Sequence, residues 1–134
     1  MIGEINKKML QAMFAKIPIE FSIVDENDEV IAWNKHETRI FKRPLGVMGR
    51  NVRKCHPKHS LDKVLTIINE MKANKRDKAR FWIDLTVKGF EDKQKVLIEY
   101  YALRDEEGKY LGCIEVSQNI TEIQKLVGIK RLLD

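Results

Sequence analysis

The run CHPKH, residues 55–59, is the only concentration of side chains in this chain that readily ligate metals. A structural zinc site takes four such ligands, usually from separated pairs. The other cysteine, Cys113, is predicted on the opposite face of a sheet, so the fourth zinc donor is missing. Haem iron needs only one or two axial ligands, and His56 or Cys55 has the right chemistry. The alternative, which we prefer for these residues, is that the run forms the entry to the next helix and His56 packs or hydrogen-bonds locally.

Motifs for catalysis and for nucleic-acid binding are missing from the sequence. It contains no Gly-x-Ser-x-Gly, no phosphate-cradling loop and no pair of carboxylates framed by apolar residues, so we do not expect an enzyme. The net charge of +5 arises largely from basic clusters at residues 50–54 and 72–80. Neither cluster interleaves aromatic residues for base stacking, so we do not expect a nucleic-acid partner.

Length and composition describe one ordinary globular domain. The chain has 134 residues, enough for a sizeable core, and combines 43% hydrophobic with 34% charged residues. No apolar run approaches the roughly 18 residues of a membrane helix, and the N-terminus lacks a signal-peptide core. Two cysteines indicate reduced thiols rather than a disulfide framework. We therefore expect a cytoplasmic protein without a membrane partner.

The first half of the chain alternates helical and strand patterns. Residues 2–16 carry an apolar stripe at helical spacing and end at Pro18. Strands are predicted over residues 19–25 and 29–33, and Asn34 then caps a short helix with Glu37 at its third position. Ser60 is predicted to cap the next helix, which carries the apolar stripe Leu61, Val64, Leu65, Ile68 and Met71 and stops near Asn74.

The second half reads as three strands and a helix. Residues 79–88 give a clean alternation with one buried face, which indicates antiparallel pairing. Two longer strands flank the turn at residues 105–108, where Gly108 supplies positive φ. By parity the return strand places Ile114 and Val116 on the inner face. Thr121 is predicted to cap a final helix with Gln124 at its third position.

Two of these segments resemble PAS domains. The run VDENDEVIAWN at residues 24–34 is similar to the opening hairpin of that family, and the return strand ending in Asn-Ile-Thr-Glu is similar to its last strand and exit. The resemblance implies an α+β fold with a five-stranded antiparallel sheet, helices on one face and a flanking helix at each end. It divides the chain into an N-terminal amphipathic helix (1–17), a PAS domain (18–121) and a C-terminal connecting helix (122–134).

The run GRNVRKCHP at residues 49–57 resembles a prokaryotic subgroup of PAS domains. In that subgroup the PAS domain often follows a hemerythrin-like domain within one longer chain. No iron-binding helical bundle is encoded in these residues, so the resemblance implies an isolated sensor module or a piece of a larger protein with an effector or hemerythrin-like domain.

The PAS resemblance also implies a function and a cavity. We expect a sensory module in signal transduction that binds a small molecule or a partner, with a haem-based redox or gas sensor using His56 or Cys55 as the runner-up. The cavity lies on the inner sheet face, unless large side chains fill it. Its expected lining is Phe21, Ile23, Phe41, Met48, Val52, Leu65, Ile68, Phe81, Ile83, Ile98, Tyr100, Ile114 and Val116.

The outer sheet face is unusually apolar for a solvated surface. Strand parity predicts that it carries Trp82, Tyr101, Leu103, Leu111 and Cys113. A contiguous apolar patch of this kind usually marks an interface. We therefore expect a homodimer whose contact includes the N-terminal helix and this face.

Overall fold

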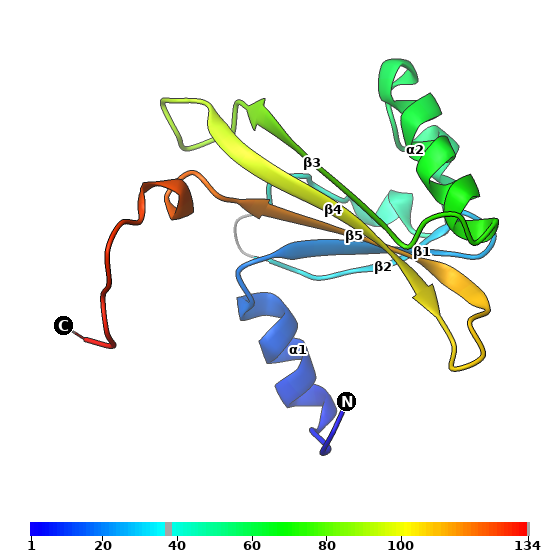
Figure 1. The fold of residues 1–134 in the computed structure, drawn as a ribbon, viewed down its shortest axis with the longest axis horizontal. Coiled ribbons are helices and arrows are strands. Elements are labelled where there is room, and N and C mark those ends of the chain that lie inside the picture. The colour runs from blue at the N-terminus through cyan, green and yellow to red at the C-terminus, as the bar shows by residue number, and fades with distance from the viewer. Residues whose placement is uncertain (37–38, 134) are drawn as a thin grey trace.

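The computed structural model describes residues 1–36 and 39–133, which form a five-stranded antiparallel sheet with one helix on either side (Figure 1). The strand order is β2-β1-β5-β4-β3. This confirms the predicted α+β class and sheet. The elements are α1 (Lys7–Lys16), β1 (Glu20–Asp25), β2 (Val30–Trp33), the 3-10 turns Leu45–Val47 and Val52–Lys54, α2 (Lys58–Lys72), β3 (Lys78–Leu85), β4 (Gln94–Arg104), β5 (Tyr110–Asn119) and the 3-10 turn Ile123–Lys125.

The core lies between α2 and the inner face of the sheet. One buried cluster joins Met71 of α2 to Val96, Ile98 and Tyr100 of β4. A second cluster joins Ile68 and other α2 residues to β2 and to the turn at Val52–Lys54. The predicted apolar stripe of α2 therefore makes the core. No helix among the described residues is long and apolar enough to cross a membrane.

Strands β3 and β4 pair as their alternation predicts. Phe81 lies opposite Ile98, and two ion pairs link opposed residues on the other face, Arg80 with Glu99 (3.8 Å) and Lys95 with Asp84 (2.5 Å). However, β3 is an edge strand, and Phe81 remains 36% exposed on the inner face. The inner face is therefore incompletely covered along this edge.

The predicted parity of β1 and β5 is wrong. Glu115 lies opposite Tyr100 and Ser22, and Cys113 is buried in the inner core rather than on the outer face. Phe21, Ile23, Ile114 and Val116 consequently lie on the outer face, opposite their predicted side. Hydrophobicity misled the prediction because both faces of these strands are covered here, the outer face by α1 and the inner face by polar contacts described below.

Helix α1 is shorter than predicted and rests on the outer face. It begins after Asn6, whose side chain accepts a hydrogen bond from the Met9 N–H (2.8 Å). Phe14 meets Phe21 of β1 edge-on, with ring centroids 5.2 Å apart. No α1 residue is buried, so the helix is attached by a small part of its surface.

Two predicted N-caps have other roles. Asn34 caps no helix within the described residues, since residues 34–36 and 39–41 are irregular, and its predicted partner Glu37 lies outside them. Ser60 lies inside the first turn of α2, because that helix begins at Lys58 after Pro57. The predicted stop at Asn74 is confirmed, since this residue follows the helix with a φ of 59°.

The predicted C-terminal helix over residues 122–134 is not formed in the part that the structure describes. A single 3-10 turn at Ile123–Lys125 is followed by exposed, irregular chain. A helix of this length without a packing partner is marginal in water. Thr121 therefore has a different role: its Oγ1 accepts a hydrogen bond from the Lys95 N–H (2.8 Å), which ties the exit of β5 to the start of β4.

Replacing Thr121 by Val tests this tie. The variant keeps the side-chain shape but leaves the Lys95 N–H without its acceptor, so the free energy of unfolding should fall by about 1 kcal/mol. Urea denaturation measures the loss, and hydrogen exchange should locate it at Lys95. The control is Thr66→Val, because the Thr66 hydroxyl only donates to the Asp62 carbonyl on an exposed helix face. Equal losses in the two variants would contradict the assigned role.

Candidate functional site

The inner face is polar where β1 and β5 cross it. Glu20, Ser22 and Ser117 point to this side and are each less than 5% exposed. Glu115 lies between them in the register. Sequence reasoning missed these residues because it assigned the apolar neighbours to the inner face. Their alternation, every second residue along both strands, is the signal that identifies them.

Arg39 covers this polar patch and uses its whole guanidinium group. Its Nε donates to the Phe41 carbonyl (2.7 Å), and its Nη2 donates to Ser22 Oγ (3.0 Å). Its Nη1 donates to the backbone carbonyl (2.9 Å) and side-chain Oδ1 (3.2 Å) of Asn34. Burial lowers the pKa of Arg39, an effect that the nearby Glu20 carboxylate opposes. The group remains charged, since an arginine pKa lies far above neutrality.

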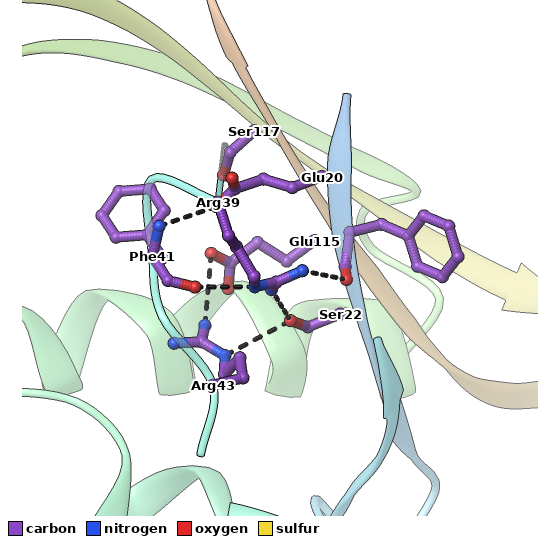
Figure 2. Close-up of a pocket in the computed structure, with 8 residues that line it drawn as sticks. Glu20, Ser22, Arg39, Phe41, Arg43, Glu115 and Ser117 are labelled. Carbon is purple, nitrogen blue, oxygen red and sulfur yellow. Dashed lines mark hydrogen bonds and ion pairs between the residues drawn. The ribbon is translucent and has the colours of Figure 1, made fainter. Parts of the chain in front are cut away.

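Glu20 holds the Arg39 segment against the sheet. Its carboxylate accepts hydrogen bonds from the backbone N–H groups of Ile40 (2.5 Å) and Phe41 (2.8 Å). Charge-assisted bonds of this kind are stronger than those between neutral groups. Figure 2 shows Glu20, Arg39 and Phe41 drawn together in this way over β1.

A second group surrounds Glu115. The Tyr100 hydroxyl donates to its Oε2 (2.9 Å), Arg43 Nη2 lies 3.9 Å from its Oε1, and His56 Nε2 lies 4.0 Å from its Oε2. Arg43 Nε also donates to Ser22 Oγ (3.3 Å), so Ser22 is shared by two arginines (Figure 2). The two groups form one continuous polar network beneath residues 39–43.

An open groove of about 620 Å³ adjoins this network. It shares Glu20, Arg39 and Ser117 with the smaller pocket of Figure 2, which is filled by its own side chains. The groove is lined by the chain before and at the start of β1, by the segment after β2, by the chain after β3 and by the end of β5. Its lining residues are Pro18, Ile19, Glu20, His36, Arg39, Ile40, Lys42, Thr86, Val87, Lys88, Phe90, Ser117, Gln118 and Asn119. No sequence motif marks these residues, because only the sheet order brings them together.

The predicted haem site does not fit the geometry. His56 Nδ1 donates to the Val52 carbonyl (3.0 Å), and its Nε2, the remaining ligand atom, faces Glu115. Cys55 Sγ donates to the Asn51 carbonyl (3.6 Å). No group of three or more His, Cys, Asp or Glu side chains in the described part of the chain is arranged to hold a metal. The residues around His56 thus match the predicted helix entry better than an axial ligand.

The other predicted lining residues are scattered over both faces of the sheet and the neighbouring turns. Val52, Leu65 and Ile68 pack in the α2 cluster, and Phe41, Ile98 and Tyr100 in or against the other cluster. Phe81 stacks on Tyr100 with centroids 6.0 Å apart, and Ile83 is 36% exposed. Met48 is half exposed on a turn, and Phe21, Ile23, Ile114 and Val116 are on the outer face. The structure does not bring these residues together as one cavity.

Several groups have raised pKa values. Burial raises the pKa of the Cys113 thiol to about 12, so this thiol is unreactive. Burial, followed by the Glu115 carboxylate, raises the pKa of Tyr100 well above its ordinary value. The pKa of Tyr101 is raised mainly by its hydrogen bond to Glu99, and that of Tyr110 mainly by burial.

These shifts predict how stability depends on alkaline pH. Tyrosine side chains in the unfolded chain lose their proton near pH 10. At that pH the folded tyrosines, whose pKa is raised, remain protonated. The unfolded state then binds fewer protons, so the free energy of unfolding should fall as pH rises above about 10. Tyr100→Phe should make this fall shallower, as measured by urea denaturation at several pH values. Tyr101→Phe is the control on the outer face and should change the slope less. An unchanged slope in Tyr100→Phe would contradict the assignment.

Comparisons with known proteins agree with this architecture. A family model described as a PAS domain matches residues 10–121. A C-terminal domain from Streptococcus mutans is 27% identical, with a TM-score of 0.81, over 95% of this chain and 94% of that one. No relative was found among curated proteins.

Two further solved structures share the fold at lower identity. The PAS domain of BvgS from Bordetella pertussis is 16% identical with a TM-score of 0.63, and each chain is covered to 88%. A sensory box sensor histidine kinase from Vibrio cholerae is 15% identical with a TM-score of 0.58, over 86% of this chain and 91% of that one. With the family model spanning most of its length, the chain belongs to the PAS domain family.

Proposed function

We propose that this PAS domain is a sensory signalling module that binds a small molecule in the inner-face groove. The groove itself is the observation that supports this function. Its volume of about 620 Å³ falls within the range of small-molecule sites, and it combines apolar walls with a few polar groups. PAS domains are generally sensory rather than catalytic modules, and the similar folds include domains of sensor histidine kinases.

The lining of the groove favours a ligand with an apolar body and an anionic end. Ile40, Val87 and Phe90 supply apolar surface. Arg39, Lys42 and Lys88 bring three permanent positive charges, whereas Glu20 brings one negative charge that is already bonded to backbone N–H groups. Lys42 and Lys88, for which the described residues provide no ion-pair partner, lie beside these apolar walls and suit an aromatic or aliphatic carboxylate.

Filling the groove tests the proposal. Val87→Trp places a large side chain on its wall, whereas Val127→Trp adds the same group to the exposed C-terminal chain and is the matched control. NMR titration with a set of small aromatic carboxylates should shift the amide signals of residues 86–90 and 117–119. Val87→Trp should weaken binding at least about tenfold, and Val127→Trp should not. Shifts confined to the outer face, or equal affinity in both variants, would refute the site.

We also propose that the module forms a homodimer through α1 and the outer face. Trp82 is 63% exposed at the middle of β3, and Leu111 is about half exposed on β5. Ile5 just before α1, and Met9 and Met13 within it, present further exposed apolar side chains. An apolar surface of this kind is characteristic of an interface. A second copy can pair the two surfaces symmetrically, as in most homodimers.

Introducing charge into this surface should break the dimer. Trp82→Lys is expected to shift sedimentation velocity toward the monomer, since an unpaired charge would be buried in the contact. Leu45→Lys is the control, because Leu45 is also a large, exposed apolar residue but lies on a turn far from this surface in sequence. A monomeric wild type, or two variants that behave alike, would exclude the interface.

The sequence of residues 49–57 supports a proposal about one further partner. PAS domains with a similar sequence in this segment often follow a hemerythrin-like domain, so we propose that such a domain, or an effector, accompanies this module in a longer protein. The complete coding sequence tests this directly. An open reading frame that encodes no additional domain would rule it out.

A further inference from the structure

Asn34 is a buried junction between three elements. The residue is only 3% exposed. Its Nδ2 donates to the Phe14 carbonyl in α1 and to the Ile19 carbonyl just before β1, both at 2.9 Å. Its Oδ1 accepts a hydrogen bond from the Phe21 N–H of β1 (2.7 Å). One amide group thus fixes the end of α1 to the start of the sheet.

Arg39 connects this junction to the groove. Its Nη1 donates to both oxygens of Asn34, and the same guanidinium group contributes to the groove lining. The Asn34 amide has two donors on one side and one acceptor oxygen on the other, and all are used. Its orientation therefore depends on Arg39 as well as on α1.

We infer that Arg39 and Asn34 form a link through which the inner face controls the docking of α1. An acceptor group in the groove that draws Nη1 away from Asn34 removes the charged donor that holds the amide in place. The amide can then turn, and its bond to the Phe14 carbonyl weakens. The part of this inference that concerns a ligand rests on the proposed function, but the link from Arg39 to α1 does not need a ligand.

The attachment of α1 is weak enough for such control. None of its residues is buried, and its anchors include the Phe14–Phe21 ring contact and the Asn34 bond. Elements with few buried contacts open at lower free energy than the core and are the ones that move in switches. Because α1 carries the exposed Met9 and Met13 and follows the exposed Ile5, its release changes the surface offered to a partner.

A matched pair of arginine variants tests the link without a ligand. Arg39→Lys keeps the positive charge but cannot reach Asn34 and Ser22 together. Arg43→Lys is the control, because Arg43 belongs to the same network and bonds Ser22 but has no described bond to Asn34. Hydrogen exchange should show α1 amides exchanging at least about tenfold faster in Arg39→Lys than in Arg43→Lys, with β4 amides unchanged.

Asn34→Asp provides an independent second variant. Aspartate retains the acceptor for the Phe21 N–H but cannot donate to the Phe14 and Ile19 carbonyls. It should therefore release α1 to the same extent as Arg39→Lys. The inference is overturned if α1 exchanges equally in both arginine variants, if α1 and β4 lose protection together, or if wild-type α1 is already unprotected. Failure of carboxylate binding with intact coupling would instead refute only the proposed ligand.

Discussion

The charge of the Arg39 guanidinium, placed over the polar strip of β1 and β5, is the interaction on which this fold depends. Without it, the Phe41 carbonyl would lose its side-chain donor, and Ser22 and the Asn34 carbonyl would keep only the Arg43 Nε and the His36 N–H as donors. An unsatisfied buried polar group costs about 1–3 kcal/mol, so this one side chain offsets a loss of that size and strengthens two further acceptor sites. Glu20 then balances the charge while fixing the Arg39 segment by its backbone. The inner face consequently has an apolar half beneath α2 and a polar half beneath residues 39–43.

The sequence predicted the buried face correctly where a strand or helix buries only one face. The alternation of β4 and the stripe of α2 predicted their buried residues correctly, because in each element one face is buried in the core and the other is not. It failed at β1 and β5, where Phe21 and Ile114 are apolar but lie on the outer face, Phe21 against Phe14 of α1. When both faces are covered, hydrophobicity no longer specifies which one is inside.

The candidate site was only partly predictable for the same reason. Phe41 and Tyr100 were expected near the inner face and are there, but the residues that form its polar network, Glu20, Ser22 and Glu115, were not identified. Ser22 meets Arg39 and Arg43, which follow it by 17 and 21 residues in the sequence, and Glu115 meets Arg43 from a distant strand. The caps assigned to Asn34, Ser60 and Thr121 failed because each side chain finds a different partner once the chain is folded.

The two ion pairs between β3 and β4 have a consequence for pairing fidelity. Strand β3 is an edge strand without full cover on its inner face, which is the situation in which strands slip or recruit a foreign strand. Arg80 faces Glu99 and Asp84 faces Lys95, so the two pairs have opposite polarity along the strand. Displacing β3 by two residues separates both pairs at once, and an identical strand from another molecule offers like charges in parallel alignment. Charge order on an exposed edge thus selects one register and disfavours parallel pairing with an identical strand.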